Sequence, residues 1–257
     1  MAKWVCFEDE GQERIGLLEG ETIIAHTGDL FDSPAPTDIR RPLGAVRLLP
    51  PCRPSKVIAL WNNFRQLAAK LDVPEPDEPL YLLKAVSSIA APGATITRPS
   101  SYSGKVVYEG ELGIVIGRPL GNATEAEAEA GIFGYTCVND ITAAEIIGRD
   151  KTFAQWARAK SFDGFGPFGP VIATGLDPRG LHVRTELNGA ERQNYPLDDM
   201  IFPPARLISA LSRDMTLLPG DLICCGTSLG VGSIKEASNS VTVTIDGIGT
   251  LSNRFTQ

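Results

Sequence analysis

The sequence lacks the features that mark nucleic-acid-binding, membrane and secreted proteins. Its 257 residues carry a net charge of −7 and contain no basic tract, which argues against nucleic acid or an anionic membrane as the main partner. No uninterrupted apolar run is long enough to span a bilayer. The first ten residues turn acidic at once and contain no apolar signal core. We therefore expect a cytoplasmic protein.

Cysteine and histidine are also scarce. The five cysteines are odd in number and show no Cys-x-x-Cys spacing, so the sequence predicts neither a disulfide framework nor a zinc site. Cys224 and Cys225 lie in an apolar stretch, where buried thiols are poorly reactive, and we interpret them as packing residues. The two histidines, His26 and His182, are interpreted as structural or exposed rather than catalytic.

The chain divides into a short and a long region. Residues 1–50 are interpreted as a small N-terminal β domain with strands at 4–7, 15–18 and 22–25. Six prolines between positions 34 and 54 indicate an extended linker rather than packed structure. The catalytic domain is assigned to residues 55–257 and is expected to begin with a buried strand at 56–60. Hydrophobic residues make up 43% of the chain, enough for a substantial core.

The long region predicts mostly strands with a few short helices. Helical patterns occur at 64–71, with Asn62 or Asn63 as the N-cap, and at 124–130, 142–159 and 205–212. In the third of these, a break is expected near Gly148. A further strand is expected at 80–84, and Asn-Gly and Asp-Gly pairs at 188 and 246 predict hairpin turns. Strands and helices do not alternate as βαβ units. The sequence therefore predicts a β-rich α+β fold.

The most informative segment is Tyr-Glu-Gly-Glu-Leu-Gly-Ile-Val-Ile-Gly, residues 108–117. Apart from its two glutamates it has the composition of a buried strand. Side chains alternate along a strand, so Glu109 and Glu111 are expected on one face, with Val107, Gly113 and Val115. Two like charges in an apolar setting require a nearby cation. Oxygen ligands favour Mg²⁺, Mn²⁺ or Ca²⁺ over zinc.

Two further residues fit this interpretation. Asp140 ends the apolar run 132–139, where a strand is expected to open into a loop, and completes a set of three metal-binding carboxylates. Lys160 is the candidate for an additional balancing positive charge. The alternative is an edge strand whose glutamates face water. That alternative explains the Glu-x-Glu spacing but not the aspartate and lysine segments that follow it.

Five segments in a fixed order resemble the fumarylacetoacetate hydrolase family. They are residues 108–117, then Gly-Tyr-Thr-Cys-Val-Asn-Asp-Ile-Thr-Ala, Ala-Lys-Ser-Phe-Asp-Gly-Phe-Gly-Pro, Leu-Asn-Gly-Ala-Glu-Arg-Gln, and Leu-Leu-Pro-Gly-Asp-Leu-Ile-Cys-Cys-Gly-Thr-Ser-Leu-Gly-Val-Gly. The resemblance runs from residue 56 to the end of the chain. It implies a mixed β-roll core, a homodimer, and Mg²⁺ or Mn²⁺ bound by Glu109, Glu111 and Asp140. It also implies a small 2-oxo acid or β-dicarbonyl acid as substrate.

The resemblance assigns further roles by position. Lys160 matches the active-site lysine of the family. Thr227 matches a threonine beside the substrate carboxylate, although Ser228 stands where the family has proline. Backbone N–H groups of the glycine-rich loop, beginning at Gly226, are expected to hold a carboxylate, with a purely structural turn as the alternative. Lys84 matches a lysine frequent in the family and is either a substrate contact or a solvent-exposed strand end.

The chain departs from the hydrolytic members at the residues that activate water. Those members carry a histidine three residues after an Asn-Tyr pair and a glutamate three residues further on. Here Leu67 and Lys70 occupy these positions, and Trp61 replaces a usual glycine. Ala144 stands where many members have an arginine. Arg65 is the candidate to replace that arginine or the histidine as a substrate-binding residue, with a solvated arginine as the alternative.

Three functions remain open on the sequence alone. The first is metal-dependent C–C bond cleavage, by hydrolysis or decarboxylation, through a metal-stabilised enolate with Lys160 and Glu109 as catalytic residues. The second is an isomerase or tautomerase of the 2-hydroxyhepta-2,4-dienedioate type, or a hydratase. The third is a metal-binding homologue without catalysis. The missing histidine lowers the expectation of hydrolysis relative to decarboxylation and isomerisation.

Overall fold

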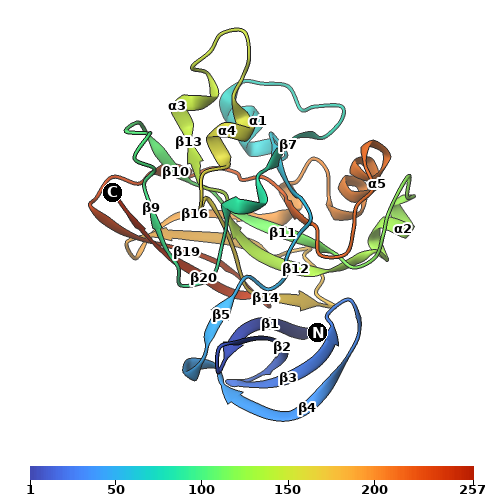
Figure 1. The fold of residues 1–257 in the computed structure, drawn as a ribbon. Coiled ribbons are helices and arrows are strands. Elements are labelled where there is room, and N and C mark those ends of the chain that lie inside the picture. The colour runs from blue at the N-terminus through green and yellow to red at the C-terminus, as the bar shows by residue number, and fades with distance from the viewer.

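Strands dominate the architecture, which confirms the β-rich α+β prediction. The computed structural model describes all 257 residues and arranges the strands in three sheets of twelve, three and five. The first strands form a module at one end of the molecule, and helices α1 (Arg65–Leu71), α3 (Ala144–Ile147) and α4 (Trp156–Lys160) lie at the opposite end (Figure 1). No helix in the structure is both long and apolar enough to cross a membrane.

The N-terminal module is a curled run of antiparallel strands. Its strands are β1 (Ala2–Asp9), β2 (Gln12–Glu19), β3 (Thr22–Asp29), β4 (Asp32–Pro42) and β5 (Arg47–Leu49). Strand β4 pairs with β3 over most of its length, with His26 opposite Pro36 and Thr22 opposite Pro42. The interpretation of this proline-rich stretch as unpacked linker is therefore wrong. The prolines are tolerated because β4 is the edge strand, where a missing N–H costs no ladder hydrogen bond.

The main sheet continues from the module without interruption, because β1 pairs with β14. Its order is β4-β3-β2-β1-β14-β12-β11-β17-β6-β7, and β8, which follows β7 after one short turn, pairs with β14. This last pairing curls the sheet into a roll. The strands of the roll are β6 (Val57–Trp61), β7 (Leu80–Lys84), β8 (Ile89–Ala90), β11 (Gly110–Ile116), β12 (Ile132–Asn139), β14 (Gly166–Thr174) and β17 (Leu222–Cys224).

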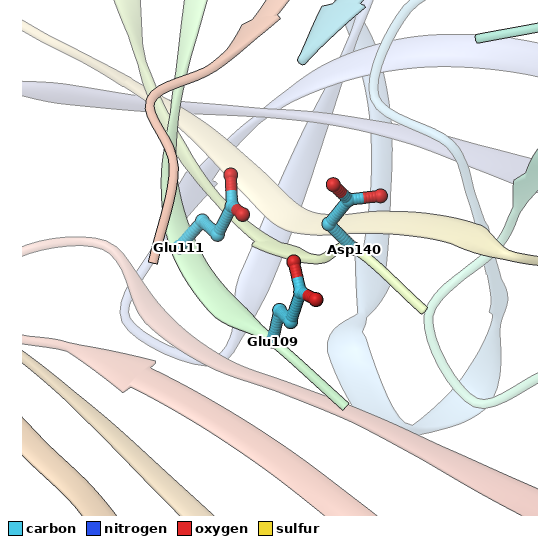
Figure 2. Close-up of side chains that lie close together, drawn as sticks. All are labelled: Glu109, Glu111 and Asp140. Atoms are coloured by element: carbon cyan, nitrogen blue, oxygen red, sulfur yellow. The ribbon is translucent and has the colours of Figure 1, made fainter. Parts of the chain in front are cut away.

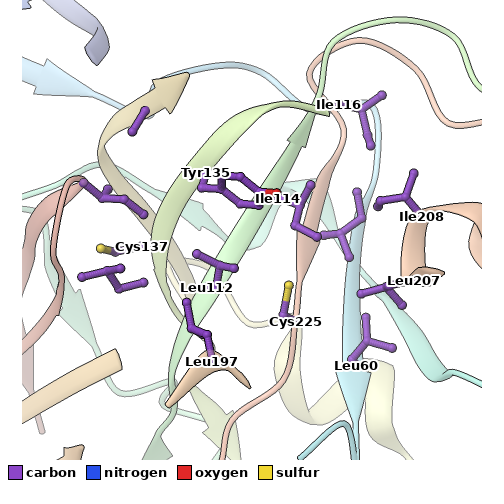
Figure 3. Close-up of a cluster of buried hydrophobic side chains, with 14 of the residues drawn as sticks. Leu60, Leu112, Ile114, Ile116, Tyr135, Cys137, Leu197, Leu207, Ile208 and Cys225 are labelled. Carbon is purple, nitrogen blue, oxygen red and sulfur yellow. The ribbon is translucent and has the colours of Figure 1, made fainter. Parts of the chain in front are cut away.

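Side-chain alternation divides the roll into two packed faces. Leu112, Ile114 and Ile116 of β11 belong to the largest buried cluster, together with Leu207 and Ile208 of helix α5 (Figure 3). The intervening residues of the same strand face the other way, and Val115 packs in a second cluster with Val138 and Phe168. Each fully buried aliphatic side chain contributes roughly 1.5–3 kcal/mol. Glu111 of β11 lies on this second face, while Glu109 immediately precedes β11 and Asp140 immediately follows β12.

The remaining elements surround the roll. The three-stranded sheet contains β10 (Val106–Tyr108), β13 (Thr142–Ala143) and β18 (Gly232–Ser233). The five-stranded sheet contains β9 (Thr95–Thr97), β15 (His182–Leu187), β16 (Ala190–Pro196), β19 (Ser238–Ile245) and β20 (Gly249–Thr256). The helices are α1 (Arg65–Leu71), α2 (Glu125–Glu129), α3 (Ala144–Ile147), α4 (Trp156–Lys160) and α5 (Pro204–Asp214). Both predicted hairpin turns are present, at Asn188 between β15 and β16 and at Asp246 between β19 and β20.

The asparagines before α1 do not cap it. Phe64 is the residue at the N-cap, and no side chain there accepts a helix N–H. The Asn63 amide instead donates to the Cys225 carbonyl at 2.9 Å and accepts from the Phe202 N–H at 2.9 Å. Asn62 adopts a positive φ of 56° and donates to the Pro74 carbonyl. Both side chains therefore join distant backbone segments, an arrangement that local sequence does not predict.

The helix expected at 142–159 is largely absent. Thr142 and Ala143 form β13, which pairs with β10, and only the short helices α3 and α4 follow. The break near Gly148 is confirmed, because α3 ends at Ile147 and α4 begins nine residues later at Trp156. Strand pairing thus takes the first residues of the helical pattern. Lys160, one residue beyond the predicted segment, ends α4 and points into the molecule.

Candidate metal centre and active site

Pairing of β11 with β12 brings three carboxylates together. Gly110 lies opposite Asn139 in this pairing, so Glu109, just before β11, and Asp140, just after β12, are neighbours at the same end of the two strands. The Asp140 N–H donates to the Glu109 carbonyl at 2.8 Å. One carboxylate oxygen from each of Glu109, Glu111 and Asp140 lies within 4.8 Å of the other two. Figure 2 shows the three carboxyl groups directed toward a common space. The alternative of an edge strand with water-facing glutamates is therefore wrong.

Lys160 of α4 reaches the same space. Its Nζ donates to Glu109 Oε2 at 2.7 Å, to Asp140 Oδ2 at 2.6 Å and to Thr142 Oγ1 at 2.7 Å. The Lys160 side chain is 3% exposed. All three ammonium protons are thus directed at oxygen atoms, which matches the balancing role expected from the sequence. Thr142 also donates to the Asp140 carbonyl at 3.1 Å, which holds this hydroxyl between the lysine and the carboxylates.

A second lysine supports the aspartate from the other side. Lys84 Nζ pairs with Asp140 Oδ1 and donates to the Phe165 carbonyl at 2.9 Å. The side chains of Lys84 and Asp140 are both fully buried. The alternative of a solvent-exposed strand-end lysine is therefore wrong. The observed contact is with Asp140, and substrate contact by Lys84 remains a prediction.

Burial and charge act in opposite directions on these groups. Burial raises the pKa of Glu109, with Lys160 offsetting part of the effect. Burial raises the pKa of Glu111 well above its usual value, and the negative charge of Asp140 adds to the effect. Burial also disfavours the charged form of Asp140, but Lys160 and Lys84 outweigh it and lower the pKa of this carboxyl. For Lys160, the three carboxylates outweigh burial and raise the pKa of the ammonium.

Glu111 retains an unused ligand oxygen. Its Oε2 accepts from the Gly226 N–H at 2.9 Å, whereas its Oε1 is buried without a hydrogen-bond partner. Three carboxylates and two ammonium groups leave one negative charge in a buried site. A divalent cation would give the orphan oxygen a partner, because hard cations prefer carboxylate oxygens, and would change the net charge from −1 to +1, which an acidic substrate would balance. The residues present therefore fit the Mg²⁺ or Mn²⁺ expected from the sequence.

The glycine-rich loop is joined to the glutamate strand by a residue that the sequence analysis did not single out. Gln193 of β16 is buried, and its Oε1 accepts from the Gly110 N–H at 2.9 Å. Its Nε2 donates to Thr227 Oγ1 at 2.8 Å and to the Leu229 carbonyl at 3.2 Å. Thr227 in turn donates to the Gly110 carbonyl at 3.1 Å. One feature of the sequence could have indicated Gln193: it lies two residues before Tyr195 on the same strand, and alternation places both side chains on the buried face.

Arg65 is engaged outside the carboxylate cluster. Its guanidinium donates to the Met200 and Asp199 carbonyls, and its Nε lies 3.6 Å from Glu75. No contact in the structure joins Arg65 to the carboxylates, and its role in substrate binding stays a prediction.

The two positions of the usual water-activating pair hold no base. Leu67 packs against the largest hydrophobic cluster, and Lys70 is exposed. His26 contacts the Ile24 carbonyl, and His182 contacts Asn194. The structural interpretation of both histidines agrees with these contacts.

These features, a rolled sheet with three clustered carboxylates and a buried lysine, coincide with the family indicated by sequence comparison. Residues 56–256 match the C-terminal domain of fumarylacetoacetate (FAA) hydrolase, and residues 2–51 match the N-terminal domain of Rv2993c-like proteins. The chain therefore belongs to the fumarylacetoacetate hydrolase family, whose members include hydrolases, isomerases and tautomerases.

Individual relatives are similar over most of their length. Protein Rv2993c of Mycobacterium tuberculosis is 40% identical over 226 residues, which cover 87% of this chain and 83% of the relative. Oxaloacetate tautomerase YisK of Bacillus subtilis is 34% identical over 259 residues, covering 93% and 84%. The crystal structure of 2-hydroxyhepta-2,4-diene-1,7-dioate isomerase from Mycobacterium marinum superposes with a TM-score of 0.90 at 37% identity, covering 100% and 98%.

Proposed function

We propose that the protein is a divalent-metal-dependent tautomerase or isomerase that moves a proton within a small 2-oxo carboxylic acid. The observation that carries the proposal is that Lys160 donates to Glu109 and Asp140 within a buried acidic cluster. In addition, Leu67 and Lys70 of α1 stand where the hydrolytic members have the histidine and glutamate that activate water. Proton transfer between carbon and oxygen needs no activated water, whereas hydrolysis does. The names of the Bacillus and Mycobacterium marinum relatives point to the same class of reaction.

Glu109, Glu111 and Asp140 are the residues that would hold Mg²⁺ or Mn²⁺. When bound, the ion would act as a Lewis acid that polarises the 2-oxo group and makes the neighbouring C–H more acidic. Glu111 has an unpaired Oε1 for this purpose, and the Gly226 N–H orients its other oxygen. Lys84 holds Asp140 from the side away from Lys160, so that the aspartate cannot rotate freely.

Lys160 is assigned the proton-handling role. Ketonisation of an enol moves one proton from the C2 oxygen to C3: the Glu109 carboxylate would take the oxygen proton, the Lys160 ammonium would deliver a proton to C3, and transfer from Glu109 to Lys160 across their 2.7 Å hydrogen bond would restore both groups. The Lys160 ammonium, oriented by Glu109 and Thr142, would stabilise negative charge on that oxygen as it develops. Glu109 is the most exposed of the three carboxylates, at 16%, and therefore the one that borders the substrate. The backbone N–H of Thr227 and those of the loop after it would bind the substrate carboxylate, because the Gly226 N–H and the Thr227 hydroxyl already donate to Glu111 and to the Gly110 carbonyl.

The reaction is tested by following the ultraviolet absorbance of the enol of oxaloacetate as it converts to the keto form. Catalysis is expected with Mg²⁺ or Mn²⁺, and it should disappear on chelation. A matched control is Lys56→Met, which removes a lysine paired with a buried aspartate, Asp221, elsewhere in the roll. No metal-dependent acceleration with this enol or with a panel of dienol acids would overturn the proposal.

Decarboxylation is the second candidate, and it keeps the C–C cleavage expected first from the sequence. It uses the same polarised 2-oxo group and needs no water-activating base, so the missing histidine does not oppose it. Release of CO₂ and pyruvate from oxaloacetate, at a rate matching enol loss, would favour this candidate. If the metal binds and no acid reacts, the protein is instead a metal-binding homologue without catalysis.

We also propose a cytoplasmic homodimer. The edge strand β7 carries Tyr81 and Leu83 on one face, 37% and 48% exposed, and Val86 follows at 49%. Apolar groups adjacent to an unpaired strand edge are typical of protein contacts. Light scattering after size-exclusion chromatography should give twice the chain mass of 27.5 kDa. A monomer at micromolar concentration would reject this assembly and leave the enzymatic proposal untouched.

A further inference from the structure

Two tryptophans from different elements meet near the carboxylate cluster. The rings of Trp61, at the end of β6, and Trp156, at the start of α4, lie 5.6 Å apart between centroids with an interplanar angle of 51°. Both side chains are only partly buried. The third tryptophan, Trp4, packs against His26 in the N-terminal module and takes no part in this contact. Neither member of the pair has a role in the mechanism above.

Strand register places Trp61 beside the cluster. Gly113, Cys224 and Ala59 form one row across β11, β17 and β6. Glu111 lies two residues before Gly113, and Trp61 lies two residues after Ala59, so both are displaced to the same end of the roll. Alternation gives both side chains the same face of the sheet. Two strand spacings separate them, which is about 10 Å.

The position between them carries no side chain. Gly226 lies two residues after Cys224 and donates its N–H to Glu111, so its backbone occupies the space between β11 and β6. Its φ is +87°, and a Cβ there would meet the Leu60 carbonyl at 3.3 Å and Asn63 at 3.5 Å, so a side chain is disfavoured by conformation and by contact. Gly226 therefore places no side chain in the row between Glu111 and Trp61, and the Cβ that it lacks would point to Leu60 on the opposite face of β6.

Trp156 closes the same space from the opposite side. It precedes Lys160 by four residues, which is one turn of α4, so the two side chains lie on neighbouring positions of one helix face. Lys160 reaches the carboxylates, and Trp156 reaches Trp61. The aromatic contact thus joins β6, which pairs with β17, to α4, the helix that carries the lysine.

We propose that Trp61 and Trp156 form the wall that limits the length of the substrate tail. This inference rests on the proposed function, because it assumes a 2-oxo acid whose 2-oxo and carboxylate groups bind the metal ion held by Glu109, Glu111 and Asp140. About 10 Å accommodates the ion and a C4 or C5 acid, and the tail of a longer acid meets the two rings. The protein is therefore selective for short 2-oxo dicarboxylic acids, and the aromatic pair is a specificity determinant.

Binding affinities test the wall without relying on turnover. Calorimetry with Mg²⁺-loaded protein compares oxalate, 2-oxoglutarate and 2-oxoadipate, which share the chelating head and differ in tail length. Trp61→Ala and Trp156→Ala are expected to improve the affinity for 2-oxoadipate relative to oxalate about tenfold. Oxalate affinity itself should stay within twofold of the wild-type value. Phenylalanine at either position should preserve the wild-type preference.

Trp4→Phe serves as the matched control and as a reporter. It leaves the pair as the only tryptophans, and tail-bearing acids should change their fluorescence whereas oxalate should not. If both alanine variants still bind oxalate and keep the wild-type ratio of oxalate to 2-oxoadipate affinity, Trp61 and Trp156 do not limit tail length. The proposed function would be unaffected by that result. Loss of binding of every acid by the wild-type protein would instead reject the proposed function, and the wall with it.

Discussion

Two buried charge clusters in this molecule differ in how completely they are paired. In the N-terminal module, Asp9 is 5% exposed, and Arg14 and Arg41 occupy both of its oxygens at 2.7–3.1 Å. In the roll, Glu111 is fully buried and one of its oxygens has no partner. The first cluster is saturated and serves packing. The second retains capacity for a ligand, which distinguishes a site from a structural ion pair.

The cations differ in the same sense. The module uses arginine, whose planar guanidinium pairs with carboxylates in a rigid geometry and does not deprotonate. The roll uses Lys84 and Lys160, whose ammonium groups are compact point charges that can donate along several directions. Lysine therefore leaves more freedom for a metal ion and a substrate oxygen to enter the cluster.

The largest expected effect is that of Lys160→Met. The variant should lose about 10²–10⁴-fold in turnover, the range for removal of a positioned acid or base. Stopped-flow measurement of enol loss provides the rate, and the Lys56→Met control should keep the wild-type rate. Wild-type turnover in Lys160→Met would show that the buried lysine is structural, as the arginines of the module are.

Metal binding should stabilise the roll through Glu111. At a metal concentration of about 100 times Kd, the free energy of unfolding should rise by about 2.7 kcal/mol. Glu111→Gln should lose this increment while the metal-free protein stays about as stable as wild type, because burial raises the pKa of Glu111 and so favours the neutral carboxyl, which the amide resembles. Urea unfolding with and without Mn²⁺ measures both. An equal metal effect in the variant contradicts the ligand assignment.

The module should respond in the opposite way. Asp9→Asn breaks a saturated pair, and we expect a loss of about 1–3 kcal/mol, below the range for fully buried pairs because Arg14 and Arg41 are 26% and 32% exposed. Metal affinity should not change, since the module supplies no ligand. A change in the Mn²⁺ affinity of this variant would couple the two clusters and weaken the contrast between them.

The smallest effect is expected for Gln193→Leu. The change leaves the Gly110 N–H without its partner and removes a donor from Thr227, at a cost of about 1–2 kcal/mol. Because Gly110 separates Glu109 from Glu111, the Kd for Mn²⁺ should also weaken. Surface position Gln66 offers a matched control, Gln66→Leu, which should change neither quantity. Loss of stability with unchanged metal affinity would limit Gln193 to packing.

The sequence predicted the local part of the site well. A period of two predicted that Glu109 and Glu111 share one face, although the strand expected at 108–117 is divided and Glu109 lies between β10 and β11; Asp140 follows the end of β12 as expected. The helices at 64–71, 124–130 and 205–212 were close to α1, α2 and α5. Predictions failed where the decisive partner lies far along the chain: Asn63 bonds to Phe202 and Cys225, and the prolines of β4 pair with β3.

Composition, strand periodicity and the order of motifs determined the fold class, the family and the choice of Glu109, Glu111 and Asp140 as clustered carboxylates, because each depends on residues close together in the chain. Tertiary structure alone decided that Lys84 is buried on Asp140, that Gln193 ties Gly110 to Thr227, and that Trp61 meets Trp156. These contacts join residues separated by tens of positions. Their formation depends on how the sheet curls and where α4 docks, and no local pattern encodes either.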